Sequence, residues 1–336
     1  MENLLVSEKN PKNFDKSSIL LMIPVFNDWK SLEILLMHLD EVLHDEKIKV
    51  EVLVVDDGSN LRHPKQLISQ KFKALNKVEI LELRRNLGHQ RAIAIGLAYI
   101  EARVICQAVV LMDGDGEDAP TDVVRLINKY SREGDEKIVF ARRTQRSESL
   151  LFKFFYKLYK WLYKLLTGQQ IGVGNFSIIP YNILHRLVVV SEIWNHYASG
   201  VLKARIPHTE IPSKRANRLA GKSKMNFVSL VAHGLSAISV YGDIVGVRLL
   251  VASCLLILFT IIALVVVTTI KLTTTLAIPG WTSYLVGIFF VMIMQGVMLS
   301  LFFIFVTLNA RNNSSFLPNR DYHYFILGLQ KVFTKV

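Results

Sequence analysis

Short apolar runs alternate with amphipathic stretches through the first third of the chain. Four runs have the length of buried strands, at residues 19–25, 50–55, 78–83 and 108–112. Between them, residues 30–43, 64–75 and 89–102 carry apolar side chains at the spacing of helices. Strands and helices that alternate in this way predict an α/β fold, with a mixed, mainly parallel sheet covered by helices on both faces.

Two long stretches nearer the C-terminus contain no formal charge. Residues 249–270 would extend about 33 Å as a helix, enough to cross a hydrocarbon core about 30 Å thick, and residues 282–310 are longer. Lys and Arg flank the pair on its outer sides, so the positive-inside rule predicts two transmembrane helices with both termini in the cytoplasm. A buried hairpin of a soluble protein is the alternative, but soluble core helices seldom stay uncharged for so long.

These features divide the chain into a cytosolic domain and a membrane anchor. Residues 1–17 lack the apolar core of a signal peptide and are expected to form a polar tail. The domain is expected to span residues 18–224, and an amphipathic juxtamembrane helix over 225–248 would lead into the first span. Residues 311–336 would then be a cytosolic C-terminal tail.

The net charge of +12 comes from one block of the chain. Between Arg142 and Lys224 there are 15 Lys and Arg but only 3 Asp and Glu, so the rest of the chain is neutral overall. Lysines recur at helical spacing among aromatic residues over 150–166, which is typical of a helix in a membrane interface. A solvated core helix and a partner-protein helix are alternatives, whereas nucleic-acid binding would leave the spans unexplained and is not expected.

Acidic side chains follow the predicted strands, where ligands of parallel sheets bind. The DGDGED segment at 113–118 places Asp113, Asp115 and Glu117 at alternate positions of a Gly-containing loop. Oxygen ligands of this kind suit Mg²⁺ or Mn²⁺, which also contact substrate phosphates. An EF-hand is excluded because Asp118 and Val124 stand where it needs Gly and Glu. A solvated acidic turn is the simpler alternative.

Seven segments of residues 19–230 resemble, in order, the family 2 glycosyltransferases with the GT-A fold, and among them the polyprenyl-phosphate glycosyltransferases. They are PVFND, VVDDGSN, RRNLGHQRAIAIGL, MDGDGEDAP, ARRTQRSES, GNFSIIP and RANRLAGKSKM. The resemblance implies metal-dependent, inverting transfer of one sugar from a nucleotide-sugar donor, such as UDP-glucose or GDP-mannose, to undecaprenyl or dolichyl phosphate. It also implies an integral inner-membrane protein whose catalytic domain faces the cytoplasm. A processive polysaccharide synthase, which usually carries a QxxRW motif absent here, and an inactive membrane scaffold are the alternatives.

The resemblance also implies binding roles for individual residues. A divalent metal, Mg²⁺ or Mn²⁺, would be held by Asp113, Asp115 and Glu117. The nucleotide would be bound by Pro24, Phe26, Asp28, Asp56 and Asp57, and by a donor-closing loop that carries Arg215, Arg218, Ser223 and Lys224. The acceptor phosphate would be bound by Arg143, Arg146, Ser149 and Lys153. Membrane lipids are further expected partners, and the sequence leaves self-association into a homo-oligomer open.

The expected catalytic residues are Asp113, Asp115, Arg143, Arg146 and Asn175. Asn175 departs from the family pattern, because many relatives have an Asp there that has been considered a candidate base. Asn cannot accept a proton at neutral pH. The acceptor, however, is a phosphate whose second pKa is about 6, so it arrives largely as a dianion and needs no base.

Overall fold

The computed structural model describes residues 18–61, 71–145, 150–170, 172–221, 227–274, 280–312 and 316–335. The chain forms two compact units. The sheet unit consists of Met1–Lys153, Gly172–Val240 and Ser315–Val336, and the helical unit consists of Phe154–Ile171 and Tyr241–Ser314.

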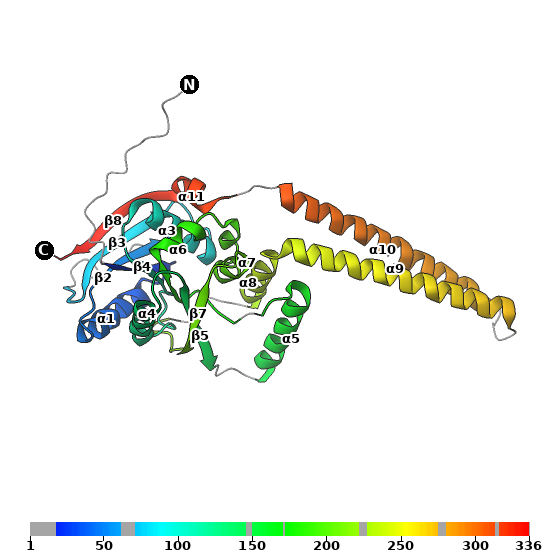
Figure 1. Cartoon of the computed structure of the whole chain (residues 1–336), viewed down its shortest axis with the longest axis horizontal. Helices are drawn as coiled ribbons and strands as arrows, with labels where there is room; N and C mark the ends of the chain where they lie inside the picture. The colour runs from blue at the N-terminus through cyan, green and yellow to red at the C-terminus, as the bar shows by residue number, and fades with distance from the viewer. Residues whose placement is uncertain are drawn as a thin grey trace, which may run out of the picture. The chain divides into compact units, whose positions relative to one another are not determined.

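An eight-stranded sheet with the order β7-β5-β6-β4-β1-β2-β3-β8 forms the centre of the sheet unit (Figure 1). Its strands are β1 (Ile19–Val25), β2 (Val50–Asp56), β3 (Leu75–Leu83), β4 (Ala108–Leu111), β5 (Ile138–Gln145), β6 (Ser177–Pro180), β7 (His208–Lys214) and β8 (Ile326–Thr334). β1 pairs in parallel with β2 and β4, and β2 pairs in parallel with β3. The four strands predicted from apolar runs, and their parallel arrangement, are therefore confirmed.

Helices cover both faces of this sheet. Successive β1 side chains enter different hydrophobic clusters: Leu21 lies with α1 (Trp29–Asp45) and α4 (Pro120–Glu133), and Met22 lies with α3 (His89–Arg103). The second cluster also takes in α6 (Tyr181–Leu187) and α7 (Tyr197–Lys203). Burial on both faces explains why these strands are continuously apolar.

Two of the three predicted helices are confirmed as α1 and α3. The third prediction, over residues 64–75, lies partly outside the described residues. Its C-terminal end is wrong, because residues 71–74 are not helical and β3 begins at Leu75.

The C-terminal segment differs from the expected tail. It forms α11 (Pro318–Asp321), a 3-10 turn (Tyr322–Phe325) and β8, which pairs antiparallel with β3 (Figure 1). Val332 is buried in the main hydrophobic cluster, and Phe333 meets Phe72 edge to face at 5.3 Å. β3 pairs with β2 along one edge, and β8 pairs with its other edge.

Two long apolar helices dominate the helical unit. α9 (Gly242–Thr273) and α10 (Trp281–Asn312) pack together, with a hydrogen bond between the Ser253 and Ser300 hydroxyls at 2.7 Å. Both are long and apolar enough to cross a membrane, and they extend the predicted spans at each end. The basic helix α5 (Leu150–Thr167) belongs largely to this unit, and Leu165 O accepts a hydrogen bond from Arg248 Nη1 at 2.6 Å.

The predicted juxtamembrane helix is not continuous. Residues 227–239 form α8 (Phe227–Ser239), and α9 starts at Gly242. Tyr241 has non-helical backbone angles (φ −104°, ψ 27°), and its buried ring packs edge to face on Tyr163. The turn between the two helices thus contains a buried aromatic contact.

Candidate active site

The DGDGED loop lies at the carboxyl edge of the sheet, directly after β4. Its backbone approaches β1 closely: a Cβ on Gly114 would lie 2.9 Å from a Val25 methyl group. Gly116 has φ +84°, a conformation that favours glycine. The Asp118 carboxylate closes the loop by accepting the backbone N–H of Asp113 at 3.0 Å. The two glycines thus let three carboxylates gather on a tight turn beside the end of β1.

Arginines from two other segments neutralise this loop. Asp115 accepts a hydrogen bond from Arg218 Nη1 at 3.0 Å, and Arg218 Nη2 also contacts Asp28 at the end of β1. Arg215 binds Glu117 with two hydrogen bonds, at 2.8 and 2.6 Å. Five of the predicted site residues are therefore brought together in one network of opposite charges: Asp28, Asp115, Glu117, Arg215 and Arg218.

Residues 215–221 are also held to the loop by their backbone. Leu219 N–H donates to Asp115 O at 3.0 Å, and Ala216 N–H donates to Glu117 O at 2.9 Å. The Leu219 side chain covers Gly116, where an added Cβ would lie 2.3 Å from Leu219 Cγ. The predicted donor-closing segment is thus seated on the acidic loop as far as the described residues reach.

Arg143, at the end of β5, adds a further cation to the loop. Its Nη2 donates to Asp118 at 3.0 Å, and its Nη1 lies 3.8 Å from Glu117. Burial and the nearby Asp113 charge raise the pKa of Asp118 above its ordinary value, although Arg143 opposes them. Burial likewise raises the pKa of Asp115. Arg143 therefore offsets part of the cost of holding these carboxylates close together.

Asp113 contains a polar atom without a partner. Its Oδ1 is buried and has no hydrogen-bond donor among the described residues, although His89 Nε2 lies 3.1 Å away. A buried carboxylate oxygen without a donor fits a cation. Within the described ranges, no three His, Cys, Asp or Glu side chains form a ready-made metal centre, because the arginines occupy Asp115 and Glu117. The residues therefore fit a metal that would compete with the arginines.

Asn175 joins this site through a chain of amide contacts. The Tyr197 N–H donates to Gln90 Oε1 at 2.6 Å, which leaves Gln90 Nε2 to donate to Asn175 Oδ1 at 3.2 Å. Asn175 Nδ2 also lies 3.1 Å from His89 Nε2, and it donates a hydrogen bond to this nitrogen only when the nitrogen carries no proton. The Asp113 carboxylate raises the pKa of His89, against the opposing effect of burial. The predicted site residue Asn175 is thus linked to Asp113 through His89, which contacts both.

The predicted nucleotide pocket is only partly available for a ligand. Phe26 is exposed beyond β1, in line with a stacking role, and Pro24 lies within β1. Asp57 is buried, and its carboxylate accepts the N–H groups of Leu87 and Gly88 at 2.7 and 2.9 Å. Asp57 therefore fixes the turn before α3. Asp56 accepts the N–H of Ser59 at 3.0 Å and shapes the turn after β2.

Four predicted residues lie beyond what the structure describes: Arg146, Ser149, Ser223 and Lys224. Lys153 lies in α5, but its side chain is outside the described part. No role for His89, Gln90 or Asp118 was predicted from the sequence. All three stand inside segments that carry the resemblance, which was the available signal.

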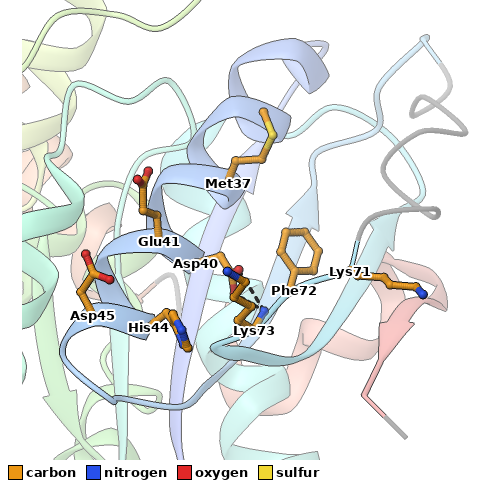
Figure 2. Close-up of a pocket in the computed structure, with 8 residues that line it drawn as sticks. All are labelled: Met37, Asp40, Glu41, His44, Asp45, Lys71, Phe72 and Lys73. Atoms are coloured by element: carbon orange, nitrogen blue, oxygen red, sulfur yellow. Dashed lines mark hydrogen bonds between the residues drawn. The ribbon is translucent and has the colours of Figure 1, made fainter.

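A cavity elsewhere on the sheet unit is separate from this site. It has a volume of about 470 Å³ and is lined by Met37, Asp40, Glu41, His44, Asp45, Lys71, Phe72 and Lys73 (Figure 2). Asp40 accepts the backbone N–H groups of Lys73 and Ala74. Asp45 lies about 24 Å along α1 from the active-site end of that helix. The polar groups of this cavity thus hold the start of β3 in place.

His196 gives the sheet unit a pH-dependent contact. It is the N-cap of α7, and its Nδ1 accepts the N–H of Ser199 at 3.2 Å, so this nitrogen must stay unprotonated. Burial, together with the neighbouring His233 and His89, lowers the pKa of His196 from 6.5 to about 3. Below pH 6.5 the His196 side chain takes up a proton in the unfolded chain, whereas in the folded protein it stays unprotonated until the pH falls to about 3. Stability from this group is therefore complete above pH 6.5 and lost as the pH falls towards 3.

We expect His196→Asn to remove this acid sensitivity, because Asn is a good N-cap that does not titrate. At pH 5 the variant should be more stable than the wild type by about 2 kcal/mol, and at pH 7.5 the two should be similar. Thermal midpoints of the full chain at the two pH values test this. An equal acid-induced decrease in both proteins would contradict it.

Comparison with known proteins identifies the class of this site. The family model for glycosyl transferase family 2 matches residues 21–194, which include β1, the DGDGED loop and Asn175. An uncharacterized glycosyltransferase of Synechocystis is 26% identical over 283 residues, covering 80% of this chain and 84% of that protein. The undecaprenyl-phosphate 4-deoxy-4-formamido-L-arabinose transferase of Salmonella choleraesuis is 26% identical over 218 residues, covering 63% of this chain and 64% of that protein.

Among solved structures, glucosyl-3-phosphoglycerate synthase from Mycobacterium tuberculosis, in complex with Mn²⁺, UDP and phosphoglyceric acid, matches with a TM-score of 0.48 and 15% identity. The match covers 68% of this chain and 79% of that one. Because the family model covers just over half of the sequence, the chain belongs to glycosyl transferase family 2. The protein is a glycosyltransferase with a GT-A-like fold, as the sequence analysis expected.

Proposed function

We propose that the protein transfers a single sugar from a nucleotide-sugar donor to polyprenyl phosphate at the cytoplasmic face of a membrane. The observation that carries this proposal is the network of charges at the carboxyl edge. Arg215 and Arg218 neutralise Glu117 and Asp115. The same guanidinium groups are suited to bind the diphosphate of a donor.

A divalent cation, Mg²⁺ or Mn²⁺, would be held by Asp113, Asp115 and Glu117, with the unpartnered Oδ1 of Asp113 as its first ligand. It would supply positive charge that stabilises the departing diphosphate. Arg218 would exchange Asp115 for a donor phosphate, and Arg215 would do the same with Glu117. The acidic loop and the arginine segment would therefore both contact the leaving group.

The transfer step requires no base from the protein. An oxygen of the acceptor phosphate forms a bond to the anomeric carbon, while the bond from that carbon to the diphosphate oxygen breaks and its electron pair leaves with the nucleoside diphosphate. No proton moves, which is compatible with Asn175 in place of an Asp. The residues contribute in-line placement and charge neutralisation, and the product has inverted anomeric configuration.

Several features support a lipid acceptor. The helical unit has two helices long and apolar enough to cross a membrane. In α5, the lysines 157, 160 and 164 and the apolar Trp161 and Leu165 are exposed, as expected for a helix in a membrane interface. The Salmonella relative is named as acting on undecaprenyl phosphate. We infer an integral protein of the inner membrane in bacteria.

The sheet itself supports the proposed topology. β8 follows α9 and α10 in the chain, yet it pairs with β3, which precedes them. Both strands must therefore lie on the same side of any membrane, and the chain between them must cross it an even number of times. Two crossings by α9 and α10, with both termini in the cytoplasm, satisfy this condition.

Incubation of the purified full-length protein with Mg²⁺ or Mn²⁺, a panel of nucleotide sugars and a short polyprenyl phosphate tests the proposal. We expect one donor to give a lipid carrying one sugar, with the nucleoside diphosphate released in equal amount. A polymer would instead indicate a processive synthase. Absence of a lipid product with every donor would contradict the proposal and favour a scaffold.

A further inference from the structure

The middle of α10 carries a polar side chain on its exposed side. Gln295 is exposed, and it has no hydrogen-bond partner among the residues that the structure describes. The apolar helix runs from Trp281 to Val306 as a candidate membrane span. Gln295 lies about 21 Å along the helix axis from Trp281 and about 17 Å from Val306. In a bilayer that α10 crosses, Gln295 would therefore lie near the centre of a hydrocarbon core about 30 Å thick.

An amide at that depth needs a hydrogen-bond partner. Hydrocarbon offers none, so an unpaired amide is unfavourable there. The Gln295 side chain is also too short to reach either interface, because half of the core is about 15 Å thick. α9 does not supply the partner: Ser300, a polar residue of α10 on that side, is bonded to Ser253, and Gly296 packs against Ile257. The missing partner of Gln295 therefore belongs to another molecule.

Gln295 lies within a stripe of exposed side chains that has the spacing of a coiled-coil seam. The members follow one another at intervals of four, three, four, three and four residues: Tyr284, Ile288, Val291, Gln295, Met298 and Phe302. All six are exposed. This spacing keeps them on one side of the helix, whereas Gly296, about 100° further round, faces α9. α10 therefore carries a second row of side chains suited to packing on a helix, which we call the Gln295 stripe.

We propose that the Gln295 stripe pairs with the same stripe of a second copy of this chain. The inference rests on the proposed membrane crossing by α9 and α10 and adds a partner to it. Copies inserted in the same orientation hold α10 in parallel, so a two-fold axis places each residue of the stripe opposite its own equivalent.

The amide of Gln295 is its own complement. Nε2 of one Gln295 can donate a hydrogen bond to Oε1 of the other, so a second copy satisfies both groups at once. A different membrane protein would have to carry a polar group of its own at the same depth. A single amide in an apolar seam also fixes the register of the two helices, because every other alignment leaves it unpaired.

The first measurement compares Gln295→Leu with Gln295→Asn in the full-length protein. Leu has a similar size but no amide, whereas Asn keeps the amide. Copies labelled at the N-terminus with a donor or an acceptor dye are reconstituted in phospholipid vesicles, and energy transfer is followed as the protein-to-lipid ratio falls. Gln295→Leu should need about tenfold more protein per lipid for half-maximal transfer, and Gln295→Asn should need less than Gln295→Leu. Association of Gln295→Leu equal to that of the wild type would overturn the proposal.

Cross-linking tests which side of α10 forms the contact. Val291 and Val297 are both exposed, but Val291 belongs to the stripe and Val297 lies about 200° round the helix from Gln295. Val291→Cys and Val297→Cys are matched variants, made in a chain in which Cys254→Ala removes the exposed native thiol. A disulfide needs Cα atoms within about 7 Å, so oxidation should join two copies of Val291→Cys and leave Val297→Cys single. Equal cross-linking of the two variants would overturn the assigned contact.

The same vesicles separate this inference from the proposed function. Insertion is measured first, as the protein that stays with the vesicles after an alkaline wash. A wild type that inserts but stays monomeric at every protein-to-lipid ratio would overturn the pairing and leave the proposed transfer reaction standing. A wild type that washes off the vesicles would overturn the proposed membrane crossing, and the pairing with it.

Discussion

Replacing Asp113 by Asn is expected to lower the rate of sugar transfer by at least about 100-fold. Asn preserves the size of the side chain but removes the negative charge of the buried oxygen that has no donor. Without that charge, the loop loses its first ligand for a cation, and the departing diphosphate is less well neutralised. The measurement is the rate of lipid-linked sugar formation at saturating donor and Mn²⁺.

A binding measurement separates this effect from misfolding. The nucleoside diphosphate should raise the thermal midpoint of the wild type in the presence of Mn²⁺, and this shift should be lost in Asp113→Asn. Asp45→Asn is the matched control, because Asp45 is an exposed aspartate at the far end of α1 (Figure 2). Transfer within about threefold of the wild type by Asp113→Asn would show that this carboxylate does not act as proposed.

Ending the chain after Phe325, which removes β8, is expected to destabilise the sheet unit by about 4 kcal/mol or more. The truncation removes the buried Val332, the contact of Phe333 with Phe72, and the ladder of hydrogen bonds with β3. It also leaves the N–H and C=O groups along one edge of β3 without partners. The thermal midpoint of the full-length protein, followed by near-UV circular dichroism, is the measurement.

A chain that ends after Thr334 is the control, because it keeps β8 and loses only the last two residues. Its midpoint should lie close to that of the wild type. If the longer truncation had the same midpoint as this control, β8 would contribute nothing to the stability of the domain.

The carboxyl edge of the sheet could be predicted because its signals are local. β1, β2, β3 and β4 are buried on both faces, so each is a short apolar run, and the chemistry follows each run directly. The strands β5 to β8 were not predicted. β7 and β8 are edge strands that mix polar and apolar residues, β5 ends in the polar residues RRTQ, and β6 has only four residues. The pairing of β8 with β3 also joins segments about 250 residues apart, which no local pattern encodes.

In the active site, too, residues with a local sequence signal could be predicted and contacts between distant segments could not. Asp113 and Asp115 were predicted from their positions after a strand, and Asp28 from the family resemblance. The contacts of His89 with Asp113, of Gln90 with Asn175 and of His196 with His233 depend on how the chain crosses the sheet. His196 shows the same dependence on the fold, because its Nδ1 caps α7 while its ring lies 4.9 Å from that of His233 in α8.

The last strand has a consequence for biosynthesis. A ribosome completes β1 to β7 first, then the apolar hairpin, and only then releases the residues of β8. The domain can therefore fold most of its sheet early, but the edge of β3 stays open until the C-terminal segment has returned. With the proposed membrane crossing by α9 and α10, completion of the fold would be timed to membrane insertion, and a chain whose hairpin fails to insert would present that open edge to other proteins in the cell.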